Sequence, residues 1–166
     1  MTKERFNLAS LLDAQTESGQ PHTLFNVVEK SCKEVFGYHF LTILKTLPDT
    51  NNVLRTHSSS PGDYLVGALK PMGGTPWGRV VLENGQTWLG NSREDVLWAF
   101  PDAQLILSKG CEACACAPVI WNRTTLGVLS LNAERDRYSN EDMVLMSRIA
   151  QSLAPALLLP ASPNQN

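Results

Sequence analysis

Charged residues are scarce in this 166-residue sequence. Only 18% of its residues are Asp, Glu, Lys or Arg, against about 25% in an average soluble protein. A low charge fraction leaves apolar surface that suits a pocket or a subunit interface. The 14 basic and 16 acidic residues nearly balance, so the basic footprint of a nucleic-acid-binding protein is missing. We therefore expect no nucleic-acid partner.

Long apolar runs are also missing. A membrane-spanning helix needs about 20 apolar residues, whereas the longest candidate, residues 153–161 (LAPALLLPA), is short and contains Pro155 and Pro160. The N-terminal sequence MTKERFNLAS lacks the apolar core of a signal peptide. We therefore predict a cytoplasmic protein with no membrane partner, whose four cysteines are reduced thiols.

The first half of the chain predicts a helix followed by a hairpin. Phe25, Val28 and Cys32 have helical spacing. Residues 39–47 (HFLTILKTL) alternate and are rich in aromatic and β-branched side chains, which predicts a strand. The turn residues PDTNN separate it from residues 53–59 (VLRTHSS), which we expect to return as its antiparallel partner.

Residues 59–109 separate this hairpin from a second one. They are irregular and rich in Gly and Pro. A short helix is predicted at residues 75–85, where Pro76 suits the first turn and Gly85 suits the end. Irregular connections of this length are uncommon unless they have a function, such as closing a pocket.

The C-terminal part predicts two apolar strands and a helix. Residues 114–121 (CACAPVIW) and 126–134 (LGVLSLNAE) flank the turn NRTT, and Ser139 is a suitable N-cap for a final helix that runs to residue 159. The whole order of elements indicates an α+β fold. We expect an antiparallel sheet with the terminal helices on one face, and loops and short helices covering a ligand pocket on the other.

These segments together resemble a GAF domain, the small-molecule sensor module of many signalling proteins. The resemblance rests on residues 23–44, on the glycine-opened short helix GGTPWGRVVLENGQT, on the hairpin APVIWNRTTLGVLSLN and on the closing YSNEDMVLMSRIAQSLAPAL. One departure is Thr75, where many members have a second glycine. The resemblance implies a GAF-like domain at residues 20–158. Outside it, the apolar spacing of residues 6–14 predicts a partly helical N-terminal extension at 1–19, and the sequence PASPNQN predicts a tail or linker at 159–166.

Three cysteines, Cys111, Cys114 and Cys116, follow the pattern C-x2-C-x-C. On a strand, Cys114 and Cys116 share one face with Cα atoms about 6.6–6.8 Å apart, at the outer edge of disulfide geometry. The two thiolates of a zinc site lie only about 3.8 Å apart, a separation that an extended strand does not readily provide. We interpret the cysteines as buried structural thiols. The alternatives are pocket lining or a redox-sensitive pair, and metal ligation.

Aromatic residues are concentrated in the segment that would cover the sheet. They predict an aromatic-lined cavity for a planar or apolar ligand, although aromatic residues in loops also serve simply as core anchors. The sequence has no G-x-S-x-G and no phosphate-binding loop, so we assign no catalytic residue. Because we interpret the cysteines as structural thiols, we also assign no metal-binding residue. The candidate ligand-binding residues are Trp77, Trp88, Trp98, Phe100, Cys114 and Cys116.

The resemblance implies a sensory, non-catalytic domain acting in signal transduction. Its small-molecule ligand and any cofactor are unidentified, and a downstream effector domain is an expected partner. The leucines at 157–159 extend the apolar stripe of the last helix, which predicts a homodimer through the terminal helices. We expect His39 to have a structural role rather than to ligate haem or iron, and His57 to face solvent.

Two other functions stay open. Free methionine-R-sulfoxide reductases resemble GAF domains and use cysteines near the glycine-opened helix, so a thiol-dependent reductase of that type is one alternative. The segment MGGTPWGRVV contains no cysteine, which counts against it. A cysteine-based redox or metal sensor is the other alternative.

Overall fold

A six-stranded sheet forms the centre of the molecule, in the order β3-β2-β1-β6-β5-β4 with every neighbouring pair antiparallel. The computed structural model describes residues 6–160, so expectations for residues 1–5 and 161–166 lie outside the described residues. The strands are β1 (Phe40–Leu47), β2 (Asn52–Ser58), β3 (Leu69–Pro71), β4 (Trp88–Gly90), β5 (Ala113–Trp121) and β6 (Thr124–Ala133).

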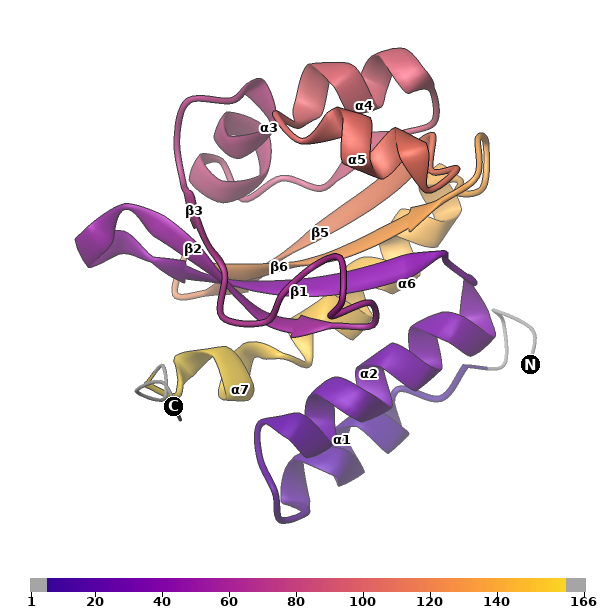
Figure 1. The fold of residues 1–166 in the computed structure, drawn as a ribbon. Coiled ribbons are helices and arrows are strands. Elements are labelled where there is room, and N and C mark those ends of the chain that lie inside the picture. Colours follow the sequence, from indigo (N-terminus) through magenta and orange to yellow (C-terminus); the bar gives the residue numbers. More distant parts are fainter. Residues whose placement is uncertain (1–5, 161–166) are drawn as a thin grey trace.

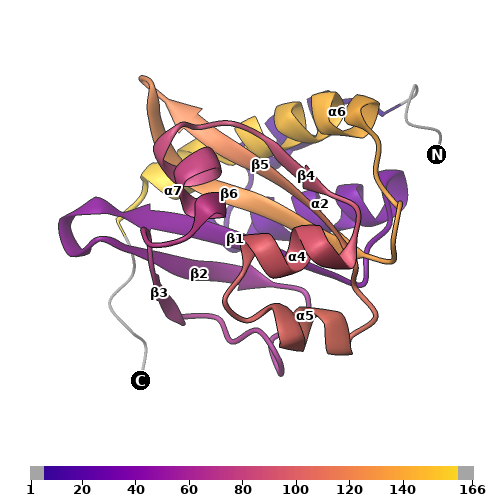
Figure 2. The ribbon, with the colours of Figure 1, turned by 90° about the horizontal axis from the view of Figure 1, so that it is seen from above.

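Helices from the two ends of the chain cover one face of this sheet (Figure 1). They are α1 (Ala9–Thr16), α2 (His22–Val35), α6 (Asn140–Gln151) and α7 (Ala154–Leu158). The short helices from the middle of the chain lie over the opposite face, as the view from above also shows (Figure 2). The predicted α+β arrangement is therefore confirmed. Within residues 6–160, no helix has the length and apolar character needed to cross a membrane.

The predicted single C-terminal helix is wrong in one respect, because it is divided into α6 and α7. Ser139 caps α6 as expected: its hydroxyl accepts a hydrogen bond from the Asp142 amide at 3.2 Å. The helix ends at Gln151, and α7 begins at Ala154 with Pro155 in its first turn. Pro155 has no amide hydrogen with which to continue the α6 ladder, but it fits a first turn well.

Successive residues of the central strands point to opposite faces of the sheet. In β1, Leu41 and Ile43 belong to the main core beneath α2 and α6, whereas Thr42 and Leu44 face the other way. The ACACA segment of β5 follows the same rule, with its alanines in the main core and its cysteines on the opposite face. Small alanine side chains let the helices pack close to the sheet.

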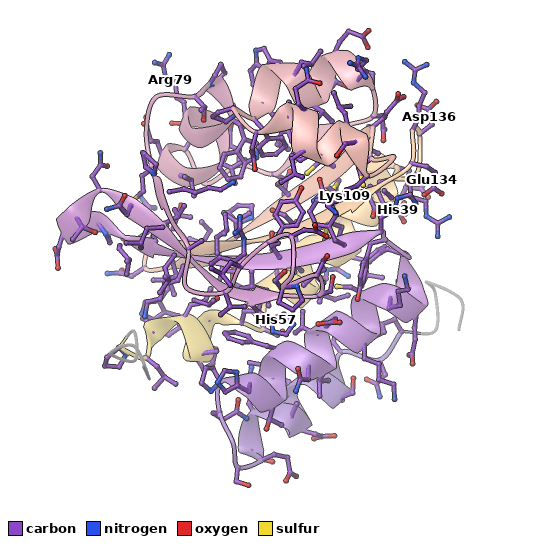
Figure 3. All side chains as sticks on the ribbon, viewed as in Figure 1. His39, His57, Arg79, Lys109, Glu134 and Asp136 are labelled. Carbon is purple, nitrogen blue, oxygen red and sulfur yellow. The ribbon has the colours of Figure 1, made fainter. Side chains whose placement is uncertain are left out.

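A β-bulge between β1 and β2 sets which β2 residues face each side. Ile43 pairs with His57, but the next residue, Leu44, pairs with Arg55, so one β2 residue has no opposite partner. His57 consequently lies on the helix face, where its Nε2 is 2.5 Å from a carboxylate oxygen of Glu29, and only 13% of its side chain is exposed. The expectation of a solvent-facing His57 was wrong, because the bulge turns the side chain toward α2 (Figure 3).

The covering segment (residues 59–109) contains the short helix predicted near residues 75–85, together with further short elements. It forms β3 and then α3 (Pro76–Gly78), the π-helical turn η3 (Arg79–Glu83), α4 (Arg93–Ala99) and α5 (Ala103–Ser108). Thr75, the departure from the common family pattern, caps α3 because its hydroxyl accepts a hydrogen bond from the Gly78 amide at 3.0 Å. A β-carbon at Gly78 would lie 2.7 Å from the Met72 carbonyl oxygen, so this turn requires glycine there.

Candidate ligand-binding site

A cavity of about 320 Å³ lies between the second face of the sheet and the covering segment. This volume is within the range of small-molecule sites, roughly 300–1,000 Å³. The sheet contributes Phe40, Thr42, Leu44, Val53, Arg55, Cys114, Ser130 and Asn132. The covering segment contributes Tyr64, Lys70, Pro71, Gly73, Thr75, Trp77, Ala99, Phe100, Pro101, Asp102 and Ile106.

Aromatic rings form two walls of the cavity. Trp77 is 7% exposed, and its ring centroid lies 5.4 Å from that of Phe100. Phe40 and Tyr64 stack with their centroids 4.2 Å apart. Of the six residues predicted from the sequence, the structure brings Trp77, Phe100 and Cys114 together around the cavity.

The other three predicted residues, Trp88, Trp98 and Cys116, do not line the cavity. Trp98 is 47% exposed, because the short helix α4 turns its buried residues Val96 and Ala99 inward and leaves Trp98 outside. Trp88 stacks on Trp98 at 5.9 Å between centroids and so forms an outer aromatic layer. Residue type alone could not reveal this, since it depends on the rotational phase of a seven-residue helix.

The thiols of Cys114 and Cys116 lie side by side next to the cavity, with their sulfur atoms 3.5 Å apart. This sulfur–sulfur distance is much shorter than the Cα separation of about 6.6–6.8 Å expected for a strand, because both side chains lean toward each other. Cys116 also contacts the indole nitrogen of Trp77 at 3.3 Å and the hydroxyl of Ser130 at 3.4 Å. All four cysteines are free and buried. Within residues 6–160, no group of three or more His, Cys, Asp or Glu residues could hold a metal ion.

Burial and hydrogen bonding shift the pKa values of the two thiols in opposite directions. Burial raises the pKa of Cys114 well above its ordinary value of 9.0. Burial acts in the same direction on Cys116, but hydrogen bonds from Cys114, Ser130 and Trp77 outweigh it and lower the pKa of that thiol. Cys116 is therefore the more acidic thiol of the pair, and it lies outside the cavity lining.

Among the buried polar residues of the lining that sequence reasoning missed, three have an atom without a hydrogen-bond partner within residues 6–160: Arg55, Tyr64 and Asn132. They are 6%, 3% and 4% exposed respectively. The Arg55 Nε, the Tyr64 hydroxyl and the Asn132 Oδ1 have no hydrogen-bond partner among the described residues. One signal could have revealed Arg55, namely that it is in phase with buried Val53 on the same strand. A charged residue at an inward position of a strand is unusual.

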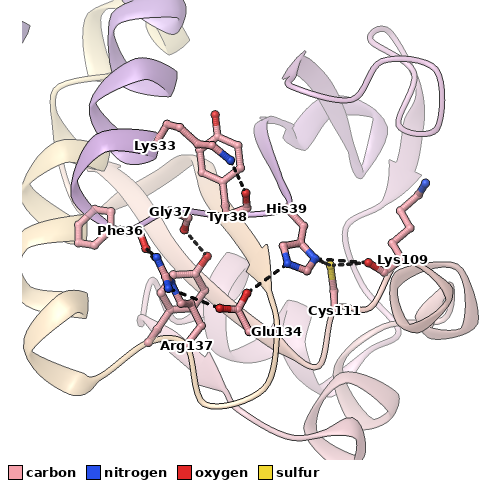
Figure 4. Close-up of polar contacts among 10 residues, drawn as sticks. Lys33, Phe36, Gly37, Tyr38, His39, Lys109, Cys111, Glu134 and Arg137 are labelled. Carbon is pink, nitrogen blue, oxygen red and sulfur yellow. Dashed lines mark hydrogen bonds and ion pairs between the residues drawn. The ribbon is translucent and has the colours of Figure 1, made fainter.

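A second polar cluster joins the start of β1 to two loops (Figure 4). His39 Nε2 lies 3.2 Å from a Glu134 carboxylate oxygen. Its Nδ1 lies 3.4 Å from the Lys109 carbonyl oxygen and 3.6 Å from the sulfur of Cys111. Cys111 is fully buried, and burial raises its pKa to about 11. A thiol that stays protonated at neutral pH is a poor nucleophile, so this Cys–His–Glu arrangement connects loops rather than forming an activated centre.

The loop after β6 is held to the end of α2 by two further contacts (Figure 4). The Arg137 guanidinium donates to the Phe36 carbonyl through Nε at 2.9 Å and Nη2 at 2.6 Å. The Tyr138 hydroxyl donates to the Gly37 carbonyl at 2.9 Å. These bonds satisfy carbonyl groups at the end of a helix, which otherwise lack partners. They give Arg137 and Tyr138 a role in holding this loop to α2.

Comparison with known proteins decides the family. The family model for the GAF domain matches residues 20–157. The chain belongs to the GAF family. GAF domains are typically sensory domains of signalling proteins. No curated protein matches this GAF domain.

Solved structures share the fold at low sequence identity. The GAF domain of a phosphoenolpyruvate-protein phosphotransferase from Coxiella burnetii is 14% identical with a TM-score of 0.75, covering 90% of this chain and 89% of its own. The GAF domain of a two-component sensor histidine kinase from Bacillus halodurans is 16% identical with a TM-score of 0.68, covering 83% of this chain and 93% of its own.

A free methionine-R-sulfoxide reductase from Neisseria meningitidis, solved with its substrate, also has this fold. It is 17% identical with a TM-score of 0.68, and the match covers 89% of this chain and 83% of the reductase. Identities this low show the fold alone. The GAF fold therefore occurs in both sensors and enzymes, and the choice for this GAF domain depends on its own residues.

Proposed function

We propose that this GAF domain is a non-catalytic sensory module that binds a small molecule in the cavity between the sheet and the covering segment. The observation that carries the proposal is the cavity itself: it has aromatic walls and contains buried polar atoms that no protein group among the described residues satisfies. Buried polar groups in native proteins almost always have partners. A ligand that supplies those partners explains why the groups are retained.

We propose that Trp77, Phe100 and Cys114 contact the ligand directly, because they line the cavity. Trp88 and Cys116 support them from behind, through the ring contact between Trp88 and Phe100 and the sulfur contact with Cys114. Trp98 is the outermost of the six predicted residues and serves as an internal control.

Ligand binding reaches the rest of the protein through the sheet. β5 contributes cysteines to the cavity side and alanines to the core beneath α6. Displacement of the sheet therefore biases the packing of α6 and α7, which passes the signal to an effector domain. We take residues 20–158 as the sensing unit, flanked by 1–19 and 159–166, and place it in the cytoplasm.

The terminal helices are the proposed homodimer interface. Leu158 and Leu159 are 49% and 43% exposed on the outer side of α7 and just beyond it, whereas Leu157 is buried in the main core. The predicted patch is therefore made by two leucines rather than three. Leu12 on α1 is 60% exposed and adds apolar surface on the same side of the sheet.

A thiol-dependent reductase is the second candidate. It is favoured by one observation, the 3.5 Å separation between the sulfur atoms of Cys114 and Cys116 beside the cavity. The raised pKa of Cys114 opposes it, because the thiol that faces the cavity stays protonated. Turnover of free methionine sulfoxide with a thiol reductant, abolished by Cys114→Ser, would establish this function in place of sensing.

Native mass spectrometry of freshly purified protein tests the sensory proposal. We expect a co-purifying small molecule in the wild type and its loss in Ala99→Leu, since Ala99 is 1% exposed and lines the cavity. Leu97→Met, at a 45% exposed position of the same helix, is the matched control and should retain the molecule. A molecule retained by Ala99→Leu, or no binding to the wild type from any metabolite extract, would contradict the proposal.

A further inference from the structure

We infer that the ligand is a carboxylate, held by Arg55, with an aromatic or apolar body and a hydrogen-bond donor of its own. This inference rests on the proposed function, since it assigns a chemical class to the ligand of the same cavity. It starts from a buried positive charge in the cavity wall that forms no ion pair with the described residues.

Arg55 is the buried charge in question. Its side chain lies on β2 with only 6% of the residue exposed. Among residues 6–160, no carboxylate forms an ion pair with its guanidinium. Its contacts are a hydrogen bond from Nη1 to the Leu65 carbonyl oxygen at 3.3 Å and the face of the Tyr64 ring, 5.2 Å from Cζ to the centroid. Burial lowers the pKa of Arg55, and the carboxylate of Asp102, which is close but not in an ion pair with it, opposes that shift. An arginine stays charged in proteins.

The unused edge of Arg55 has the shape that recognises a carboxylate. Because the Leu65 carbonyl occupies Nη1, the Nε and Nη2 groups keep no hydrogen bond to the described residues. These two groups point in the same direction and can donate two parallel bonds to the two oxygens of one carboxylate. A buried charge without a partner is costly, so an anionic ligand would remove a cost that the empty protein bears.

The charge of the cavity wall fits a single negative charge. The other ionised lining residues, Lys70 and Asp102, pair with each other at 3.0 Å between Nζ and Oδ2, and their side chains are 40% and 32% exposed. They neutralise each other at the rim and leave Arg55 as the one net charge of the lining. A monoanion balances that charge, whereas a phosphate dianion would bring an excess negative charge into an apolar cavity.

Two further groups define what accompanies the carboxylate. The Tyr64 hydroxyl is buried without a partner among the described residues, and burial raises its pKa, so it is a neutral donor. The Asn132 Oδ1 is likewise without a partner there and accepts hydrogen bonds. Tyr64 suits a second bond to the carboxylate, and Asn132 suits an N–H or O–H group on the ligand. Trp77 and Phe100 then pack against its flat or apolar part.

The experiment uses matched pairs of probes on the full chain. Phenylacetate and indole-3-acetate are compared with phenylacetamide and indole-3-acetamide, which have the same shape without the charge, and with inorganic phosphate. Binding is measured by calorimetry and by the shift in melting temperature. We expect the carboxylates to bind about tenfold to a hundredfold more tightly than their amides, the usual contribution of a charged hydrogen-bonded pair.

Variants separate Arg55 from a general effect of positive charge. Arg55→Gln should remove the preference for carboxylates. Lys70→Gln combined with Asp102→Asn, which removes the rim ion pair without changing the net charge of the lining, should keep it. Arg55→Met supplies a readout that a purely structural arginine would not give. The native charge forms no ion pair among residues 6–160, and the Met variant loses only the hydrogen bond to the Leu65 carbonyl and the contact with the Tyr64 ring. It should therefore unfold within a few degrees of the wild type or at a higher temperature. A large drop in melting temperature would overturn the inference.

The outcomes for the ligand class and for the sensory function are distinguishable. Equal binding of amides and carboxylates, lost in Ala99→Leu, would overturn the carboxylate while leaving the cavity as the sensing site. Binding of inorganic phosphate in preference to carboxylates would also overturn it. If no probe binds, the carboxylate assignment fails, and native mass spectrometry then decides separately whether the cavity holds any ligand.

Discussion

The indole nitrogen of Trp77 donates a hydrogen bond to the sulfur of Cys116, 3.3 Å away. This contact joins α3 of the covering segment to β5 at the centre of the sheet. It fixes one aromatic wall of the cavity relative to its floor. A change at the floor therefore alters the surroundings of the Trp77 ring.

Trp77 should report ligand binding by fluorescence. A ligand in the cavity replaces water or empty space against its ring, so we expect a shift or quenching that disappears in Trp77→Phe. Trp98→Phe is the control, because Trp98 is 47% exposed outside the cavity and its loss should leave the signal intact. A signal carried by Trp98 instead would show that the ligand binds elsewhere.

Replacing the thiols should destabilise the domain. Cys114→Ser and Cys116→Ser each place a hydroxyl where the sulfur is fully buried, and we expect a loss of about 1–3 kcal/mol in the free energy of unfolding, measured in urea. Cys114→Ser should cost more, because Trp77 and Ser130 already offer hydrogen bonds to position 116. Stoichiometric zinc or iron in the wild type, removed by either change, would refute a structural role.

Alkaline pH should destabilise the fold. Burial raises the pKa of Cys32 and Cys111 above 9.0 and the pKa of Tyr38, Tyr64 and Tyr138 above 10.0. Both folded and unfolded chains hold these protons below about pH 9. Above that pH the unfolded chain releases them first, so the free energy of unfolding falls as pH rises toward the folded-state pKa values.

Urea unfolding at pH 7, 9, 10 and 11 measures this effect. Tyr64→Phe should reduce the slope, because it removes one of the titrating groups and its hydroxyl has no partner among the described residues. An unfolding free energy that stays constant from pH 9 to 11 would show that these groups ionise equally in both states.

Gly127 should be irreplaceable in the β6 strand. A β-carbon at this position would lie 2.1 Å from the Leu44 carbonyl oxygen and 2.8 Å from a Leu157 methyl carbon. Backbone cannot move aside as a flexible side chain can, so Gly127→Ala should cost about 3 kcal/mol or more. Gly62→Ala is the control, since a β-carbon added there would have no described atom within 4 Å, and its melting temperature should be unchanged.

The proposed dimer should depend on the exposed end of α7. We expect Leu158→Lys to shift sedimentation from dimer to monomer at micromolar concentration, because a charge would be buried in an apolar interface. Leu65→Lys, at a 66% exposed position in the covering segment, should leave the dimer intact. A wild type that already sediments as a monomer would rule out this interface.

Much of the fold could be predicted because its signals are local. Alternation over residues 39–47, the Ser139 cap and the glycine-bearing turns each specify backbone without reference to distant residues. The division between α6 and α7 was also readable from Pro155, but the apolar stripe across it suggested one helix. Tertiary packing of Leu157 into the main core resolves that conflict.

The cavity was harder to predict, because it depends on how segments distant in sequence come together. The inward direction of Trp77 and the outward direction of Trp98 follow from the phases of two short helices. His57 leaves the cavity face, although two residues beyond Arg55, because a bulge shifts the register of β2, and a bulge has no clear signature in a single sequence. Residue type therefore identified aromatic walls, while the charged and polar groups needed the structure.

The alternation along β5 and its neighbours has a consequence for protein engineering. Positions 114, 130 and 132 face the cavity, while their neighbours 115, 129 and 131 pack beneath the helices. The two sets occupy separate surfaces, so each can be randomised in a library while the other is left constant. A biosensor built on this scaffold could acquire a new ligand preference through the first set and keep its output surface unchanged.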